Sequence, residues 1–179
     1  MSDFEMIEII NSSDIKKRNK ELALDISKYY KNSELLVLGA LKGCIYFLSD
    51  ITKLITTDLS IELINIKSYQ GMTRNNISCD SKFNFQIKGK NILIIEDIVD
   101  TGNTINFLFN KIREKEPKDV KIVSFLFKPT VYKFKINIDW VGFEIDNDFV
   151  VGYGLDYDGM FRNKDSVFKI NKKILHEEK

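Results

Sequence analysis

Three carboxylates and a short hydroxylated turn lie within nine residues, from Glu96 to Thr104. The acids are Glu96, Asp97 and Asp100, and the turn TGNT follows the last of them directly. Carboxylates can bind sugar hydroxyls, hold Mg²⁺ or accept a proton, and a glycine turn that opens a helix presents backbone N–H groups to a phosphate. This combination indicates a site for a phosphorylated ligand rather than acids that are merely solvated at a sheet edge.

Two uninterrupted apolar runs must position these residues. Ile92–Ile95 precedes the acids, and Leu35–Leu41 ends at a second glycine-containing turn, Lys42-Gly43. Runs without alternation are typical of strands buried on both faces, as in parallel sheets covered by helices. We therefore expect an α/β fold with a central, mostly parallel sheet flanked by helices. Ligands of such sheets bind beyond the carboxyl ends of the strands.

Weaker patterns supply the remaining elements. Apolar residues at helical spacing predict helices over residues 13–30, 45–55 and 104–115, the first with Ser12, Ser13 or Asp14 as its N-cap and with Lys16–Lys20 on a solvated face. Short or alternating apolar runs predict strands over residues 59–68, 82–87, 120–127 and 139–145. The tail from Lys169 onward is rich in Lys and Glu, and we expect it to be frayed.

Composition excludes several classes of function. The chain has 179 residues, 44% of them hydrophobic, which suits one globular domain. A formal net charge of +1 offers no overall field for nucleic acid or an anionic membrane. No apolar run is long enough to span a membrane, and the acids within the first ten residues predict that these are not a signal peptide. Cys44 and Cys79 show no metal-ligand spacing, and we interpret them as free thiols in a reducing cytoplasm.

The stretch from Glu96 to Thr104 resembles the phosphoribosyl-pyrophosphate motif of the type I phosphoribosyltransferases. Asp148–Tyr157, DFVVGYGLDY, is similar to the F-V-V-G-Y-G/A-L/I-D-Y segment of the hypoxanthine (hypoxanthine-guanine) branch of that family. Leu41–Cys44 resembles the pyrophosphate loop of the family, and residues 68–76 resemble its mobile lid. This chain departs from the pattern at Cys44, where Gly or Ser is usual, at Phe127, where Asp is frequent, and in a lid about one residue shorter between Tyr69 and Gly71.

The resemblance, which runs roughly from Ile15 to Arg162, implies an enzyme of purine salvage. It would transfer the 5-phosphoribosyl group from phosphoribosyl pyrophosphate to hypoxanthine or guanine and release pyrophosphate. Residues 1–179 would form one phosphoribosyltransferase domain with a lid at about 68–82. A small hood over the base would come from the N-terminal segment and residues 140–179. Mg²⁺ would be the cofactor, the chain would form a dimer or tetramer, and neither nucleic acid nor a membrane would be a partner.

The same resemblance assigns roles to individual residues. Asp100 would be the general base at the purine N7. The ribose and the 5-phosphate would contact Glu96, Asp97, Thr101, Gly102, Asn103 and Thr104. The pyrophosphate would contact Leu41, Lys42, Gly43 and Arg162, with a cis bond frequent in the family between the first two. Ser68 and Tyr69 would act in the lid. Lys128, Phe149 and Val150 would bind the purine, Lys128 through O6. Metal would be held by Glu96, Asp97 and Asp156.

Other interpretations stay open at this level. A relative that prefers xanthine would share nearly all of these residues. A non-catalytic regulator could keep the fold to sense phosphoribosyl pyrophosphate and bind nucleic acid, but it would need a basic face or an added DNA-binding module. For single residues, Lys128 could be a surface lysine at the end of a strand, and Phe149 could pack in the core.

Overall fold

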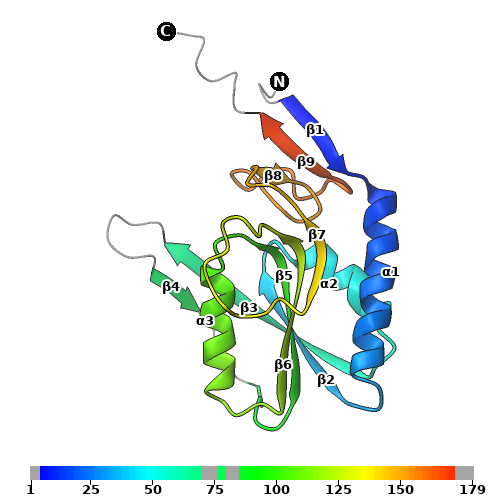
Figure 1. Ribbon diagram of the computed structural model, residues 1–179, viewed down its shortest axis with the longest axis vertical. Helices are drawn as coiled ribbons and strands as arrows, with labels where there is room; N and C mark the ends of the chain where they lie inside the picture. Colours follow the sequence, from blue (N-terminus) through cyan, green and yellow to red (C-terminus); the bar gives the residue numbers. More distant parts are fainter. Residues whose placement is uncertain (1–4, 70–75, 80–84, 172–179) are drawn as a thin grey trace.

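The computed structural model describes residues 5–69, 76–79 and 85–171, and Figure 1 shows their arrangement. The main sheet has the strand order β4-β3-β2-β5-β6-β7. Its strands are β2 (Leu35–Leu41), β3 (Leu59–Tyr69), β4 (Asn76–Cys79), β5 (Asn91–Val99), β6 (Asp119–Phe127) and β7 (Trp140–Glu144). Strand β4 pairs antiparallel with β3, and the other five are mutually parallel. The predicted α/β class is confirmed.

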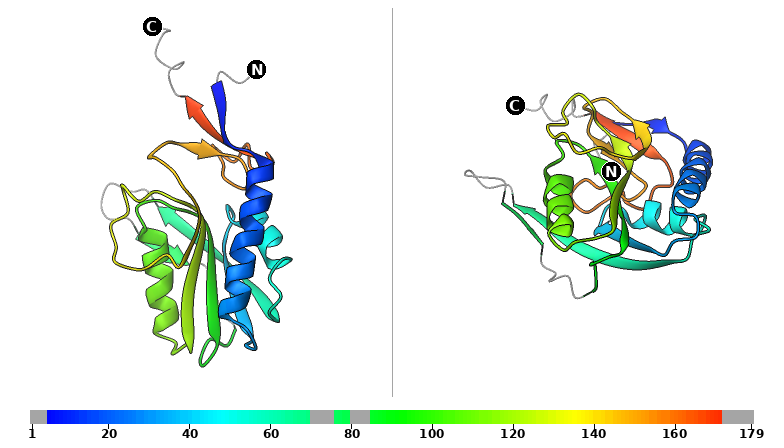
Figure 2. Two further views of the ribbon diagram at one scale, coloured as in Figure 1. Left: turned by 45° about the vertical axis from the view of Figure 1, so that its right-hand side comes forward. Right: turned by 60° about the horizontal axis from the view of Figure 1, so that its bottom comes forward.

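Helices cover both faces of this sheet, which is why its central strands read as unbroken apolar runs. Helices α1 (Ser12–Tyr29) and α2 (Ile45–Thr52) lie on one face, and α3 (Asn103–Arg113) lies on the other, as the right-hand view of Figure 2 shows. Each face has its own apolar cluster, one built on α1 and α2 and one on α3. The two clusters fix the strands between them.

The strand order creates a switch point between β2 and β5. From β2 the chain adds β3 on one side and then returns to place β5, β6 and β7 on the other. Helices that leave the carboxyl ends of β2 and β5 therefore turn to opposite faces, and the gap between those ends is where ligands of such sheets bind. Both glycine turns predicted from the sequence, at Lys42-Gly43 and at Gly102, lie at this point.

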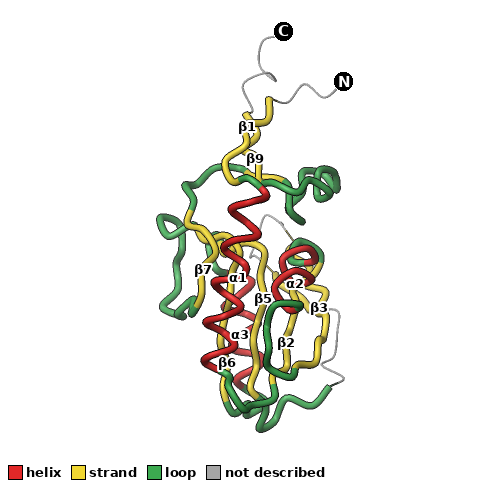
Figure 3. The backbone as a smooth tube through the Cα atoms, turned by 90° about the vertical axis from the view of Figure 1, so that its right-hand side faces the viewer, coloured by secondary structure: helices red, strands yellow, loops and turns green. Residues whose placement is uncertain are grey.

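A second, smaller sheet lies beyond this edge, with the order β1-β9-β8 (Figures 1 and 3). It consists of β1 (Glu5–Ile10), β8 (Val150–Val151) and β9 (Val167–Asn171), which lie in the segments expected to form a hood. Residues 140–144 of that expected hood instead form β7 of the main sheet. The expectation of a frayed tail from Lys169 is wrong for residues 169–171, because they pair with β1 and Lys169 Nζ lies 2.7 Å from Asp148 Oδ1.

Several predicted boundaries need correction. The N-cap of α1 is Asn11, whose side chain accepts the backbone N–H of Asp14, and not Ser12, Ser13 or Asp14. Helix α2 ends at Thr52 and α3 spans residues 103–113, both shorter than the patterns suggested. The antiparallel return from β3 is β4, whereas residues 85–87 are not in a strand although Ile87 is buried.

Arg18 was expected on a solvated face, and that interpretation is wrong. Its Nε donates to Gly142 O at 3.0 Å and its Nη2 to Val141 O at 2.8 Å, so it attaches α1 to β7. Within the described residues, no helix has both the length and the apolar character that crossing a bilayer requires.

Candidate active site

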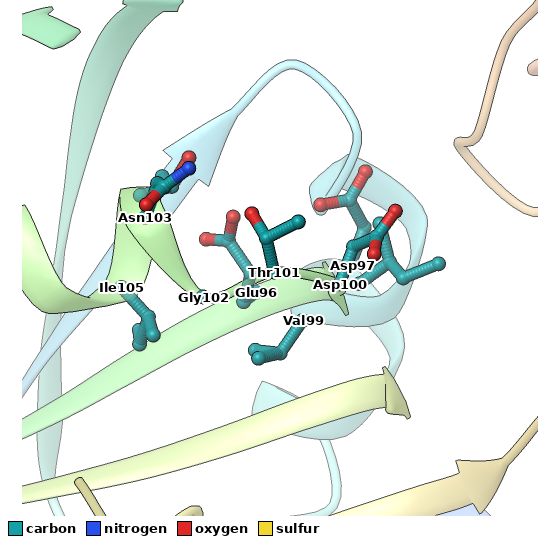
Figure 4. A pocket seen from close by; sticks show the side chains of 10 residues that line it. Glu96, Asp97, Val99, Asp100, Thr101, Gly102, Asn103 and Ile105 are labelled. Carbon is teal, nitrogen blue, oxygen red and sulfur yellow. The ribbon is translucent and has the colours of Figure 1, made fainter. Parts of the chain in front are cut away.

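Residues 96–105 line a cavity of about 240 Å³ at the carboxyl end of β5. Figure 4 shows the side chains of Glu96, Asp97, Asp100 and Thr101 projecting to the same side of the strand and its turn. The side chain of Glu96 is buried, and its Oε2 has no hydrogen-bond partner among the described residues. A buried oxygen without a partner, facing a cavity, is suited to a polar ligand.

The regular alternation of β5 is interrupted at the acid pair. Before it, Leu93 and Ile95 pack with α1 and α2, but after it the residue on that face is Ile98, three positions later. Strand β6 shows the same change, because Phe125 and Leu126 pack on one face although they are neighbours. The parallel register between β5 and β6 is kept, with Glu96 opposite Ser124 and Ile98 opposite Leu126.

The turn that follows requires glycine at position 102. Gly102 has φ +86° and is the N-cap of α3, and a Cβ there would overlap the ring of Tyr132. The loop after β6 also bonds this turn directly, because the N–H of Lys133 donates to Thr101 O at 3.2 Å. The first residues of α3 are thus held in the lining of the cavity, and the N-terminus of a helix offers backbone N–H groups that suit a phosphate.

A second cavity, of about 220 Å³, adjoins the first. Glu96, Asp97 and Thr104 line both cavities. The other residues around the second cavity are Ala40, Leu41, Lys42, Gly43, Ile66, Asp156 and Arg162. The predicted pyrophosphate residues and all three predicted metal ligands therefore meet here, while Asp100 and the TGNT turn line the first cavity.

Close backbone approaches shape this second cavity. The peptide bond between Leu41 and Lys42 is cis, as the family resemblance implied. A Cβ on Gly43 would overlap the carboxylate of Asp97, and a Cβ on Gly154 would overlap the carbonyl oxygen of Gly43. The loop after β2, the end of β5 and the turn after β8 are therefore in contact through glycines.

Burial makes the two adjacent acids difficult to ionise. It raises the pKa of Glu96 well above its usual range, and the nearby Asp97 charge adds to this. The pKa of Asp97 rises to about 6, mainly through burial, while backbone N–H groups of Ile98 and Asp97 and the charge of Arg162 act in the opposite direction. Two acids in this state favour a cation or hydroxyl donors as ligands.

Arg162 and Asp156 enter the cavity from the loop after β8. Arg162 Nη2 lies 2.7 Å from Asp156 Oδ1, and Arg162 Nη1 donates to Gly154 O at 2.7 Å. The other carboxylate oxygen of Asp156 accepts the backbone N–H of Gly159 at 2.8 Å. These bonds within the loop hold both side chains in place at the second cavity.

The side chain of Lys128 is 8% exposed, so it is not a surface lysine. Its Nζ lies 3.3 Å from Asp100 Oδ2, so the residue predicted to bind the purine O6 lies beside the predicted general base. Phe149 is 43% exposed, which rejects the core interpretation, and its ring meets Tyr157 edge-on at 5.7 Å. Val150 is buried in β8.

The donor set fits Mg²⁺, although the described residues contain no group of three or more His, Cys, Asp or Glu side chains that could hold a metal ion by themselves. Mg²⁺ commonly keeps several waters and takes one or two carboxylates together with substrate phosphates. Glu96, Asp97 and Asp156 line a single cavity, and the unpartnered Glu96 oxygen is available there.

The expectations for the lid, Cys44 and the turn after β8 have different outcomes. The side chains of Ser68 and Tyr69 and most of the expected lid lie outside the described residues. Cys44, the departure from the family pattern, is fully buried next to the first turn of α2, and burial raises the pKa of its thiol. Gly154 and Tyr153 were not singled out from the sequence, because their contacts with Gly43 and with α1 and α2 join segments far apart in the chain.

The phosphoribosyl transferase domain family matches residues 7–158. The chain is 38% identical over 157 residues to the hypoxanthine-guanine phosphoribosyltransferase of Bacillus subtilis, covering 87% of each protein. It is 36% identical over 167 residues to the hypoxanthine phosphoribosyltransferase of Haemophilus influenzae, covering 90% of this chain and 93% of that protein.

Solved structures agree with this relationship. A crystal structure of a hypoxanthine phosphoribosyltransferase from Staphylococcus aureus superimposes with a TM-score of 0.89 at 33% identity. The match covers 94% of this chain and 93% of that one.

Proposed function

Because the chain belongs to the phosphoribosyl transferase family, and within it to the hypoxanthine-guanine phosphoribosyltransferases, we propose that it transfers the 5-phosphoribosyl group of phosphoribosyl pyrophosphate to hypoxanthine or guanine. The products are the nucleoside monophosphate and pyrophosphate. The enzyme is a glycosyltransferase of purine salvage. A preference for xanthine is the alternative within the same chemistry.

One observation carries this proposal: Glu96, Asp97 and Thr104 line two adjoining cavities with different surroundings. The first cavity offers the N-terminus of α3 and suits the 5-phosphate. The second offers Lys42 and Arg162 and suits the pyrophosphate. The acids between them suit the ribose 2- and 3-hydroxyls, so a single ligand with phosphates at both ends of a sugar matches the whole site.

The purine end supports a proton transfer. Asp100 is the proposed general base at the purine N7, and Lys128 is the proposed partner of O6. A lysine ammonium only donates hydrogen bonds. It therefore favours a purine whose 6-oxo group accepts a hydrogen bond and disfavours adenine, whose 6-amino group donates one. Phe149 would stack on the base, and the backbone of Val150 would bind the purine edge.

Mg²⁺ is the proposed cofactor, held by Glu96, Asp97 and Asp156 together with substrate oxygens. When bound, it neutralises the pyrophosphate and makes it a better leaving group. The residues of this chain hold the two substrates in one geometry, which lowers the entropic cost of their reaction. Ser68 and Tyr69 would shield the reacting carbon from water, a role supported only by the resemblance of their segment to the family lid.

The remaining expectations are also proposals. Residues 1–179 would form one domain, and a homo-oligomer, dimer or tetramer, would be the working form. The substrates would be the small molecules named above rather than nucleic acid or a membrane. A reducing, cytoplasmic location agrees with the buried free thiol of Cys44.

Turnover followed by ultraviolet absorbance tests the function. Phosphoribosyl pyrophosphate and Mg²⁺ are offered with hypoxanthine, guanine, xanthine and adenine in separate reactions. We expect conversion of hypoxanthine or guanine that stops when a chelator is added. Conversion of xanthine alone would establish the alternative preference. Binding of phosphoribosyl pyrophosphate without turnover of any base would refute the enzymatic proposal and favour a sensor.

A further inference from the structure

Residues 152–154, Gly-Tyr-Gly, form a turn in which all three residues have positive φ, at +97°, +47° and +101°. Glycine adopts this conformation readily, whereas tyrosine does so at a cost in free energy. Tyr153 nevertheless lies within the core, 5% exposed, with its ring centroid 4.7 Å from that of Phe125. Its side chain is therefore the feature that attaches this turn to the body of the protein.

The hydroxyl of Tyr153 joins two helices. It accepts a hydrogen bond from Asn19 Nδ2 of α1 at 2.8 Å and donates one to Asp50 Oδ2 of α2 at 2.8 Å. A phenylalanine would fill the same space without either bond. A buried hydroxyl is costly to desolvate unless its bonds are made, so the hydroxyl needs a reason beyond packing.

The neighbour of Tyr153 connects this anchor to the second cavity. Gly154 exchanges bonds with Arg162, donating its N–H to Arg162 O at 3.0 Å and accepting from Arg162 Nη1 at 2.7 Å. Its Cα also packs against the carbonyl oxygen of Gly43. Helix α2, which carries Asp50, begins directly after that same Gly43 loop.

We propose that Tyr153 is a positioning residue for the pyrophosphate half of the site. Its hydroxyl ties the 152–154 turn to α1 and α2, and this connection holds Arg162 and its ion-pair partner Asp156 against the Lys42-Gly43 loop. The proposal rests on the proposed function, since that function assigns this cavity to the pyrophosphate. It adds a residue that contacts no substrate and acts through Gly154 and Arg162.

The test compares Tyr153→Phe with Tyr30→Phe. Tyr30 is a matched control because it is also a buried tyrosine, 2% exposed, whose hydroxyl bonds a carboxylate, Asp119, but it lies at the C-cap of α1 and lines neither cavity. Binding of inorganic pyrophosphate with Mg²⁺ is measured by titration calorimetry, and KM is measured for each substrate. All assays are run at a temperature well below the thermal unfolding midpoint of the wild type and of every variant.

We expect Tyr153→Phe to weaken pyrophosphate binding and to raise the KM for phosphoribosyl pyrophosphate by roughly tenfold. A tenfold change corresponds to about one net hydrogen bond, although the variant loses the bonds to both Asn19 and Asp50. The KM for the purine should change by less than about twofold, a limit below the effect of a single hydrogen bond. Tyr30→Phe should leave all three quantities at the wild-type values. Asp50→Ala should reproduce the effect, and Asp50→Asn, whose amide oxygen still accepts a hydrogen bond, should restore most of the binding.

Wild-type pyrophosphate affinity in Tyr153→Phe, or an equal loss in Tyr30→Phe, would overturn the proposal. A proportional rise in both KM values would also overturn it, because general loosening of the fold predicts that result. Failure of this proposal can be distinguished from failure of the proposed function. Failure of the wild type to convert any base refutes the proposed function, whereas the comparison of pyrophosphate binding among the variants still decides the role of Tyr153.

Discussion

The free protein is expected to be destabilised by its own acid pair, and Asp97→Asn tests this. The pKa of Asp97 rises from 3.8 to about 6 because the side chain is buried at the end of β5. In the unfolded chain this carboxyl loses its proton near pH 4, and in the folded protein it keeps the proton until about pH 6. The folded state therefore binds more protons in this window, so its stability falls as pH rises from about 4 to about 6.

The magnitude follows from that shift. One pKa unit corresponds to about 1.4 kcal/mol, so the ionised carboxylate costs at most ~3 kcal/mol above pH 6. An asparagine amide carries no charge but still has to be desolvated, so we expect Asp97→Asn to raise the free energy of unfolding at pH 7.5 by about 1 to 2 kcal/mol. At pH 4 the difference should vanish, because the wild-type carboxyl is then protonated in the folded state.

Urea unfolding between pH 4 and pH 8 measures this, with Asp146→Asn as the control. Asp146 is an exposed aspartate outside both cavities, so its replacement should show no such pH dependence. Saturating Mg²⁺ and phosphoribosyl pyrophosphate should stabilise the wild type more than the variant and remove the difference at pH 7.5. An Asp97→Asn protein that is less stable than the wild type at pH 7.5, or a difference that does not depend on pH, would refute the reasoning.

Four further outcomes follow from the geometry. Asp100→Asn should lower turnover by roughly 100-fold or more, which is the usual contribution of a general base, and should cause little loss of phosphoribosyl-pyrophosphate affinity. A large loss of that affinity with normal turnover would contradict the role of Asp100 as the general base. Lys128→Ala should raise the purine KM about tenfold, the effect of a lost charged hydrogen bond, and more than the phosphoribosyl-pyrophosphate KM. Equal rises in the two KM values would contradict the contact with O6. Lys121→Ala is the control, because Lys121 lies near the start of β6 whereas Lys128 follows its end. Gly43→Ala should weaken phosphoribosyl-pyrophosphate binding severely, because its Cβ would displace the Asp97 carboxylate. Gly89→Ala is the control: its φ of +73° makes alanine costly for stability, but a Cβ there has no atom within 4 Å and the residue lines neither cavity, so binding should not change. Calorimetry should detect pyrophosphate binding with Mg²⁺ and little without it, and tight binding after chelation would refute the role of the cation.

The sequence predicted the parts of this fold whose signal is local. Leu35–Leu41 is strand β2 to the residue, because a strand buried on both faces leaves a continuous apolar run. Strand β1 was missed for the opposite reason: most of its residues are exposed, and it is held by pairing with β9, about 160 residues later in the chain. The return strand of the hairpin was misplaced because Phe85 and Ile87 pack against the α3 cluster without belonging to a sheet.

The same distinction holds for the site. Glu96, Asp97, Asp100 and the TGNT turn are contiguous, so their types and spacing were enough to indicate a phosphate site. Sequence spacing could not show that Asp97 touches Gly43, or that Gly43 touches Gly154, because each contact depends on the strand order. Nor could it show the interruption of alternation at the acid pair, since the pattern of apolar residues is readable only where it stays regular.

The charges around the second cavity favour binding of a polyanion together with a metal ion over binding of the polyanion alone. Lys42 and Arg162 bring two positive charges, and Glu96, Asp97 and Asp156 bring three negative ones when ionised. Arg162 is already paired with Asp156, so its charge is partly compensated before a ligand arrives. When ionised, these acids outnumber the two basic groups, so without a metal they would repel pyrophosphate. Burial raises the pKa of Glu96 well above its usual range, but it keeps the proton on Asp97 only up to about pH 6. A divalent cation held by the ionised acids would change the summed charge of these groups from −1 (two positive, three negative) to +1, and the cavity would then attract pyrophosphate.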